Sequence, residues 1–315
     1  MGMAKNTGKT TTLNHLVSLF SGYVTALTSI GLDGEAIDQI TMLPKPDVSV
    51  TPGMLVATAQ ACLEQGDAKV EILELIGSDT PLGRIAVARI ISEGRIVLAG
   101  PVTNSLLGTT INALQKAGAD KVLVDGAFDR KAFSGLMTFE GIVLATGAAL
   151  SPDMETVIDK TRRMAMLYSL PVTSWMDALP DVPCQVMSGP KDIILPDKDP
   201  ARLKETIMDV RETLDVVSCK GAFSARMAHA LITTRAKGYT LVIDDPSKWV
   251  AGDDALRRIT ALGCRIEVRR RIPLLLVTTN PFSPVGAPFD ARTFEQRMKD
   301  VLDIPVVDVL GKETS

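Results

Sequence analysis

The chain has 315 residues, enough for one large α/β unit or two ordinary domains. Hydrophobic residues make up 46% of the chain but aromatic residues only 4%, and this aliphatic composition favours buried parallel strands covered by helices. The formal net charge of -3 argues against a broad positive surface, so we expect no nucleic-acid binding.

Cysteine and histidine usage excludes further classes. Four widely spaced cysteines and only two histidines give a Cys/His zinc site little to work with, and they are typical of free thiols in a reducing compartment. No apolar stretch approaches the roughly 18 residues that a membrane span requires. The sequence therefore predicts a cytoplasmic protein without a membrane partner.

The predicted elements alternate between helix and strand along the chain. In the first part we expect helices over 10–20, 53–64, 104–117 and 151–168, and strands over 23–30, 70–76, 121–124 and 142–145. Residues 85–91 and 95–99 flank a turn and are expected to pair antiparallel. In the last part we expect helices over 201–213, 222–237, 251–262 and 291–302, and strands over 215–218, 240–243, 265–268, 273–278 and 306–309.

This alternation predicts an α/β fold with a predominantly parallel sheet flanked by helices. Residues 171–200 are rich in proline and aspartate, which is typical of a connection. We therefore expect an N-terminal domain over 1–170, a proline-rich connection over 171–200 and a C-terminal α/β domain over 201–315.

The most informative segment is the glycine- and threonine-rich stretch over 2–11, which leads directly into the first predicted helix. Gly8, Lys9 and Thr10 stand in the order in which a phosphate-binding loop provides a backbone cradle, an ammonium group for the outer phosphates and a hydroxyl for Mg²⁺. The segment therefore predicts binding of ATP with Mg²⁺ in a P-loop. The predicted nucleotide-binding residues are Gly2, Lys5, Asn6, Thr7, Gly8, Lys9, Thr10 and Thr11.

The same segment has an alternative interpretation, a glycine- and threonine-rich helix start that binds nothing. A second question is how the loop is anchored. Such loops normally follow a buried strand, and here only Met1 precedes Gly2. Either the chain continues upstream or the strand has been lost, and its loss would weaken nucleotide binding.

Two acids stand where predicted strands end. Asp33 closes the second predicted element and Asp125 a later one, and ligands of open α/β sheets bind beyond the carboxyl ends of strands. We expect Asp33 and Asp125 to join Thr10 as Mg²⁺ ligands, and Lys9 and Asp125 to act in catalysis. The alternative is that both acids simply form Asp-Gly turns.

The five residues between Gly2 and Gly8 make a loop that resembles those of dethiobiotin synthetase and the cobyrinic acid amidating enzymes. These enzymes belong to a branch of P-loop ATPases that includes the chromosome-partitioning ATPases. The resemblance implies a second phosphate contact by Lys5 and recognition of the adenine edge by Asn280. An ordinary Asn-Pro turn is the alternative at Asn280.

The loop, the segment 32–35 and the segment 124–127 together resemble a family described as the reactivase subunit of lysine 5,6-aminomutase. The resemblance implies ATP-dependent exchange of damaged adenosylcobalamin on a protein partner, the aminomutase, together with a second ATPase subunit. It leaves a homo-oligomer open. One alternative is a synthetase that activates a small carboxylate or carbamate by phosphoryl transfer. The other is a nucleotide-binding scaffold without activity.

Overall fold

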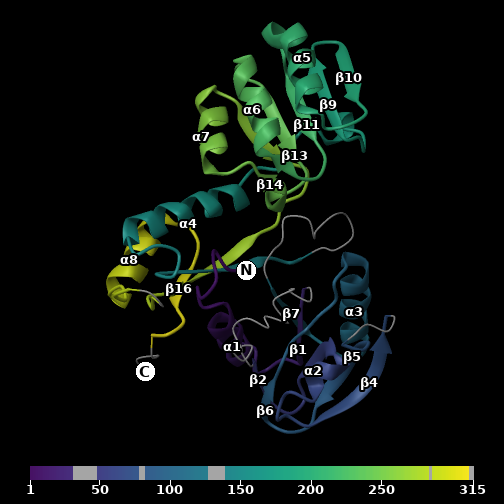
Figure 1. Cartoon of the computed structure of the whole chain (residues 1–315), viewed down its shortest axis with the longest axis vertical. Helices are drawn as coiled ribbons and strands as arrows, with labels where there is room; N and C mark the ends of the chain where they lie inside the picture. The colour runs from purple at the N-terminus through teal and green to yellow at the C-terminus, as the bar shows by residue number, and fades with distance from the viewer. Residues whose placement is uncertain (31–47, 78–81, 127–138, 284–285, 312–315) are drawn as a thin grey trace.

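The structure is a computed structural model, and it describes residues 1–30, 48–77, 82–126, 139–283 and 286–311. These residues form an α/β fold, which confirms the predicted class (Figure 1). They build two five-stranded sheets, one three-stranded sheet and two strand pairs. Both five-stranded sheets contain antiparallel strands, so the prediction of predominantly parallel sheets was too simple.

The first five-stranded sheet has the order β4-β5-β3-β1-β7. Its strands are β1 (Thr25–Ser29), β3 (Leu55–Ala59), β4 (Val70–Ile76), β5 (Ile85–Ile90) and β7 (Lys121–Asp125). β1 runs parallel to β3 and β7, whereas β5 is antiparallel to β3 and β4. Helix α1 (Lys9–Leu19) packs on one face, and α2 (Gln60–Leu63) and α3 (Asn104–Lys116) pack on the other.

The antiparallel pair predicted over 85–91 and 95–99 was wrong. β5 lies between β3 and β4, where its apolar side chains are buried, whereas β6 (Gly94–Ile96) pairs antiparallel with β2 (Val48–Val50). The turn between the two segments was recognised correctly, but each segment found another partner that buries it better.

The second five-stranded sheet has the order β10-β9-β11-β13-β15. Its strands are β9 (Cys184–Ser188), β10 (Lys191–Leu195), β11 (Val216–Cys219), β13 (Thr240–Ile243) and β15 (Arg265–Val268). The last three are parallel, and they share one apolar core with α5 (Pro200–Val210), α6 (Ala225–Thr234) and α7 (Asp253–Ala261). A short parallel pair, β12 (Phe223–Ser224) with β14 (Trp249–Val250), lies beside this sheet's carboxyl edge.

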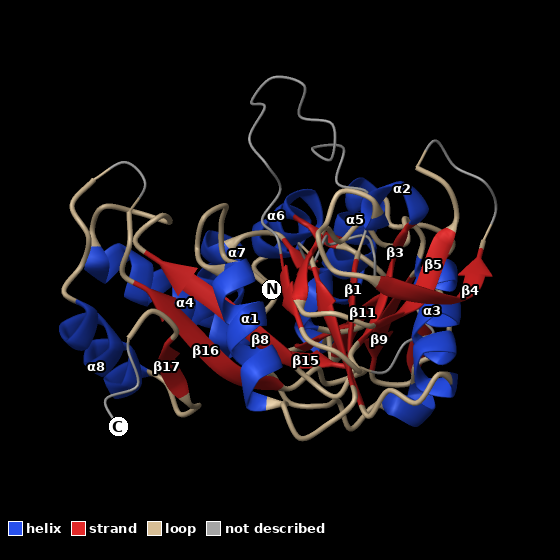
Figure 2. Cartoon of the chain, turned by 90° about the horizontal axis from the view of Figure 1, so that it is seen from below, coloured by secondary structure: helices blue, strands red, loops and turns tan. Residues whose placement is uncertain are grey.

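A three-stranded parallel sheet joins the two ends of the chain. Its strands are β8 (Ile142–Gly147), β16 (Leu274–Asn280) and β17 (Val306–Asp308), packed against α4 (Met154–Tyr168) and α8 (Ala291–Val301). Figure 2 shows this sheet with its two helices on one side of the molecule and the first sheet with α3 on the other.

The predicted division of the chain therefore differs from the strand pairing. The segments expected as separate domains, 1–170 and 201–315, share one sheet, because β8 pairs with β16. The predicted connection over 171–200 instead contains β9 and β10, which pair antiparallel. Within the described ranges, no helix is long and apolar enough to cross a membrane.

Candidate functional site

The glycine-rich segment forms a curled loop that ends at the first turn of α1. Asn6 has φ 60° and Gly8 has φ 88°, both in the left-handed region, which asparagine and glycine adopt most readily. The buried Thr7 hydroxyl donates a hydrogen bond to the Ala4 carbonyl oxygen at 2.9 Å and closes the loop on itself. The predicted residues Gly2 to Thr11 thus span an extended start beside β8, a curled loop and the first turn of α1.

The start of α1 lacks the side-chain cap or first-turn acids that the other long helices have. Gly8 is its N-cap and provides no side-chain hydrogen bond, and its first turn contains no acidic residue. Five of the other long helices in the described parts of the chain, α3, α4, α5, α6 and α8, begin with a side-chain cap. The remaining one, α7, has Asp253 and Asp254 in its first turn. No side chain therefore caps or neutralises the start of α1.

Lys9 packs directly over Gly2. A Cβ atom at Gly2 would lie 2.6 Å from Cγ and Cδ of Lys9 and 2.9 Å from the Thr7 hydroxyl oxygen. Both distances are too short for a side chain, so this approach requires glycine at position 2. Sequence reasoning assigned Gly2 to the phosphate cradle, and the structure gives it this packing role.

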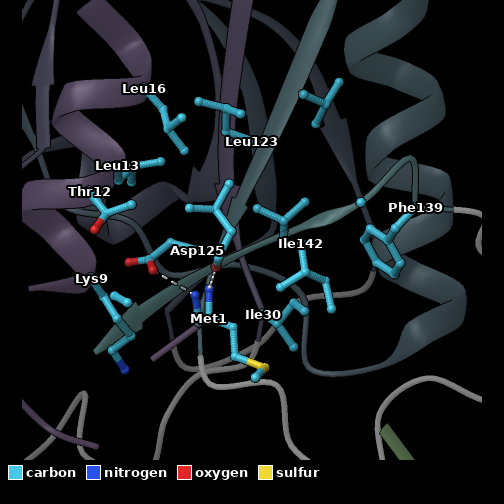
Figure 3. A pocket seen from close by; sticks show the side chains of 16 residues that line it. Met1, Lys9, Thr12, Leu13, Leu16, Ile30, Leu123, Asp125, Phe139 and Ile142 are labelled. Atoms are coloured by element: carbon cyan, nitrogen blue, oxygen red, sulfur yellow. Dashed lines mark hydrogen bonds between the residues drawn. The ribbon is translucent and has the colours of Figure 1, made fainter. Parts of the chain in front are cut away.

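Asp125 stands at the carboxyl end of β7 and lines the same cavity as Lys9 and Met1 (Figure 3). Its Oδ1 accepts a hydrogen bond from the Gly126 amide at 2.8 Å. Burial lowers the pKa of the Met1 amine to about 6; the Asp125 charge raises this pKa and the Lys9 charge lowers it further. The charges of Asp125 and Lys9 therefore both act on the Met1 amine.

The cavity is a slot between β7 and β8, with Leu13 and Leu16 of α1 on its wall (Figure 3). Its empty volume, including the open mouth, is about 840 Å³. At one end of the slot the Met1 amine donates to the Val143 oxygen at 2.8 Å, and the Met3 amide donates to the Ala145 oxygen at 2.9 Å. Residues 1–3 thus run parallel to β8, so an extended segment does lead into the loop.

Asn280 lies against the loop although it is 274 residues away from Asn6 in the chain. Its Nδ2 donates to the Asn6 carbonyl oxygen at 3.4 Å, and its Oδ1 accepts from the Phe282 amide at 2.9 Å. Both side-chain groups are engaged within the chain, and the residue is buried. Asn280 therefore supports the loop here, and recognition of adenine by this residue stays a prediction.

One contact of the site was missed by sequence reasoning. The hydroxyls of Thr12 on α1 and Thr278 on β16 form a buried hydrogen bond of 2.7 Å. Together with the Asn280 contact, it places the C-terminal strand β16 beside the N-terminal loop. Threonine in a helix and threonine at a strand end are individually too common to reveal such a pair.

The remaining predicted residues are placed as follows. Thr10 and Thr11 lie in the first turn of α1 and are partly exposed, and Thr12 rather than Thr10 lines the cavity. Asp33 lies outside the described residues. The described residues contain no group of three His, Cys, Asp or Glu side chains that could hold a metal ion. Mg²⁺ needs only one or two carboxylates and keeps several waters, so binding of this ion by Thr10 and Asp125 stays a prediction.

Comparisons with known proteins give no further assignment. No family model matches the chain, and neither the curated proteins nor the solved structures contain a significant match.

Proposed function

We propose that the loop over 2–11 binds a nucleoside triphosphate, ATP with Mg²⁺, in the manner of a P-loop ATPase of the dethiobiotin synthetase and partitioning-ATPase branch. The uncapped start of α1 carries this proposal, because its amides have neither a side-chain cap nor an acidic neighbour while Lys9 stands next to them. The parallel strands β3, β1 and β7, which end on the same side as Asp125, are consistent with it.

In this proposal each residue has a defined role. The amides of the loop and of the first turn of α1 bind the β- and γ-phosphates, and the Lys9 ammonium neutralises their outer oxygens. Thr10 and Asp125 hold Mg²⁺, which when bound neutralises further phosphate charge. Asp125 also orients the attacking water. Asn280 keeps the loop in the curled conformation through its contact with Asn6.

We further propose that ATP turnover serves a protein partner, as the resemblance to the aminomutase reactivase subunits implies. Steady-state turnover separates this role from that of a synthetase. A partner-driven ATPase is expected to respond to added aminomutase and to ignore small acids. A synthetase would turn over only when its carboxylate or carbamate substrate is present.

The binding proposal is tested by titrating the purified chain with a fluorescent ATP analogue and Mg²⁺. Lys9→Ala removes one charge-assisted contact to the phosphates, so we expect affinity to fall about 10- to 100-fold. Lys116→Ala, at an exposed lysine in the last turn of α3, is the matched control and should bind as the parent does. No saturable binding to the parent, or equal affinity in Lys9→Ala, would contradict the proposal.

A further inference from the structure

The carboxyl ends of β11, β13 and β15 form a second edge at which an α/β sheet can bind ligands. Charged residues follow two of these strands immediately: Asp244 and Asp245 after β13, and Arg269 and Arg270 after β15. Lys198 reaches the same edge from the segment before α5. Its Nζ donates to the carbonyl oxygens of Lys220 at 2.8 Å and Ala222 at 3.2 Å, in the segment after β11.

Both carboxylates of this edge are already engaged. Asp244 Oδ2 accepts from the Gly221 amide at 2.6 Å, and its Oδ1 lies 3.8 Å from Arg269 Nε. The buried Asp245 accepts from the Ser247 amide at 3.0 Å and from Arg270 at 3.1 Å.

Lys248 lacks such a partner. The residue as a whole is only 3% exposed, so its aliphatic stem packs into the fold, and its ammonium forms no hydrogen bond or ion pair within the described part of the chain. Burial lowers its pKa, and the negative charges of Asp245 and Asp244 only partly offset this effect. The Lys248 ammonium is thus partly withdrawn from water without an acceptor among the described residues, so an anion bound at this edge would stabilise it.

The charge balance of the edge points the same way. Around Lys248 itself, three cationic side chains, those of Lys198, Lys248 and Arg270, meet the two carboxylates of Asp244 and Asp245. The side chain of Arg270 is 38% exposed, so the cluster reaches solvent and a ligand can approach it. Arg269 Nε is also buried without a hydrogen-bond acceptor.

We propose that this edge binds an oxyanion, the phosphate or carboxylate group of a small molecule, with the Lys248 ammonium as its main contact. Arg270 supplies a second positive charge at the solvent side, and Asp244 and Asp245 hold the surrounding segments in place. The proposal is independent of nucleotide binding by the N-terminal loop, because none of its residues belongs to that loop.

The site lies close to the N-terminal segment all the same. Tyr168, whose hydroxyl donates to the Met1 sulfur at 3.6 Å, has its pKa raised by burial and then by the Asp245 charge. Figure 1 shows β13 and β14 at the end of the second sheet that is nearest the N-terminus. The test is therefore made in a Lys9→Ala protein, so that an anion in the N-terminal loop adds as little as possible to the signal.

Trp249 gives a local signal, because it follows Lys248 directly and stacks on Phe223 with ring centroids 5.2 Å apart. Since the chain has two tryptophans, Trp175→Phe leaves Trp249 as the only one. We expect inorganic phosphate or acetate, titrated at constant ionic strength with chloride, to change its emission saturably. The anion that binds more tightly, phosphate or acetate, shows whether the ligand group is a phosphate or a carboxylate.

Lys248→Met keeps the aliphatic stem and removes the charge, so we expect at least a tenfold loss of affinity for that anion. Lys237→Met, at an exposed lysine, is the control and should leave the affinity unchanged. Lys248→Gln is a second variant should the first fold poorly. The parent should also melt at a higher temperature in the anion than in chloride of equal ionic strength. No saturable change and no shift in melting temperature with either anion, or equal affinity in the folded Lys248 variants, would overturn the proposal.

Discussion

Gly8 is constrained both by its backbone and by its surroundings. Its φ of 88° lies in the left-handed region, and a Cβ atom there would stand 3.1 Å from both Cβ and Nδ2 of Asn280. We expect Gly8→Ala to cost about 1–2 kcal/mol of stability from the backbone alone, and to push Asn280 away from the loop. ATP affinity should therefore fall by about tenfold or more, measured by the fluorescent titration described above.

The matched control for this substitution is Gly53→Ala. Gly53 has a similar φ of 91°, but an added Cβ there meets nothing within 4 Å. Urea denaturation should show a comparable backbone cost in both variants, whereas only the Gly8 variant should lose nucleotide. Wild-type ATP affinity in Gly8→Ala would show that the curled loop is not the phosphate site.

At the residue scale, local chemistry was readable and long-range contacts were not. The order Gly8-Lys9-Thr10 predicted a loop that opens a helix, because the glycine conformation and helix start depend only on neighbours in sequence. The support from Asn280 depends on how β16 pairs, and no local pattern reports that pairing.

Among the elements, β7 is the edge strand of the first sheet that borders the slot. It pairs only with β1 among the described strands, and its apolar residues are partly exposed, whereas β1 is fully buried. The Ile30 amide donates to the Asp125 oxygen at 2.8 Å, so strand alternation directs the backbone groups of Val122 and Val124 to the slot beside β8. A parallel strand that continues upstream from Met1 would give hydrogen-bond partners to the facing backbone groups of both β7 and β8.

We therefore expect an added N-terminal extension of five alternating valines and isoleucines to occupy this slot. Burial of its side chains, less the cost of ordering it, should raise the free energy of unfolding by about 1–3 kcal/mol. Urea denaturation measures the gain, and hydrogen exchange should show new protection at the amides of Val122 and Val124. An extension of five alternating glycines and serines is the control. Equal exchange in both proteins would mean that the slot does not accept a strand.

The elements also show why composition alone predicted a connection over 171–200. Residues 171–200 are rich in proline and aspartate, but several of these residues stand beside strands rather than within them. The Pro171 and Pro183 carbonyl oxygens accept hydrogen bonds from Val268 and Lys220, and Gly189 with φ 53° forms the turn between β9 and β10. Proline content thus marked strand ends, and an average over thirty or so residues concealed the short strands between them.

For the whole molecule, the path of β16 determines how the N-terminal and C-terminal parts of the chain meet. The chain leaves the second sheet at β15, passes through β16 beside β8, and so brings its C-terminal part to the N-terminal loop. Strand and helix alternation predicted the α/β class, since it follows from local periodicity. It could not predict which sheet each strand joins, because that choice depends on burial between segments more than a hundred residues apart.

The hydrogen bond between Thr12 and Thr278 allows this arrangement to be tested energetically, since it joins α1 to β16 across a sequence separation of 266 residues. Thr12→Val and Thr278→Val each leave one buried hydroxyl without its partner, so each should cost about 1–3 kcal/mol. The double variant removes both hydroxyls and should cost less than the sum, with a coupling energy of about 1 kcal/mol in urea denaturation. Thr12→Val with Thr110→Val is the control cycle, because the buried Thr110 hydroxyl donates to Leu106 within α3 and should be additive with Thr12. If the costs of Thr12→Val and Thr278→Val were additive as well, α1 and β16 would not be energetically coupled. That result would contradict the support that Asn280, on β16, is argued to give to the phosphate site.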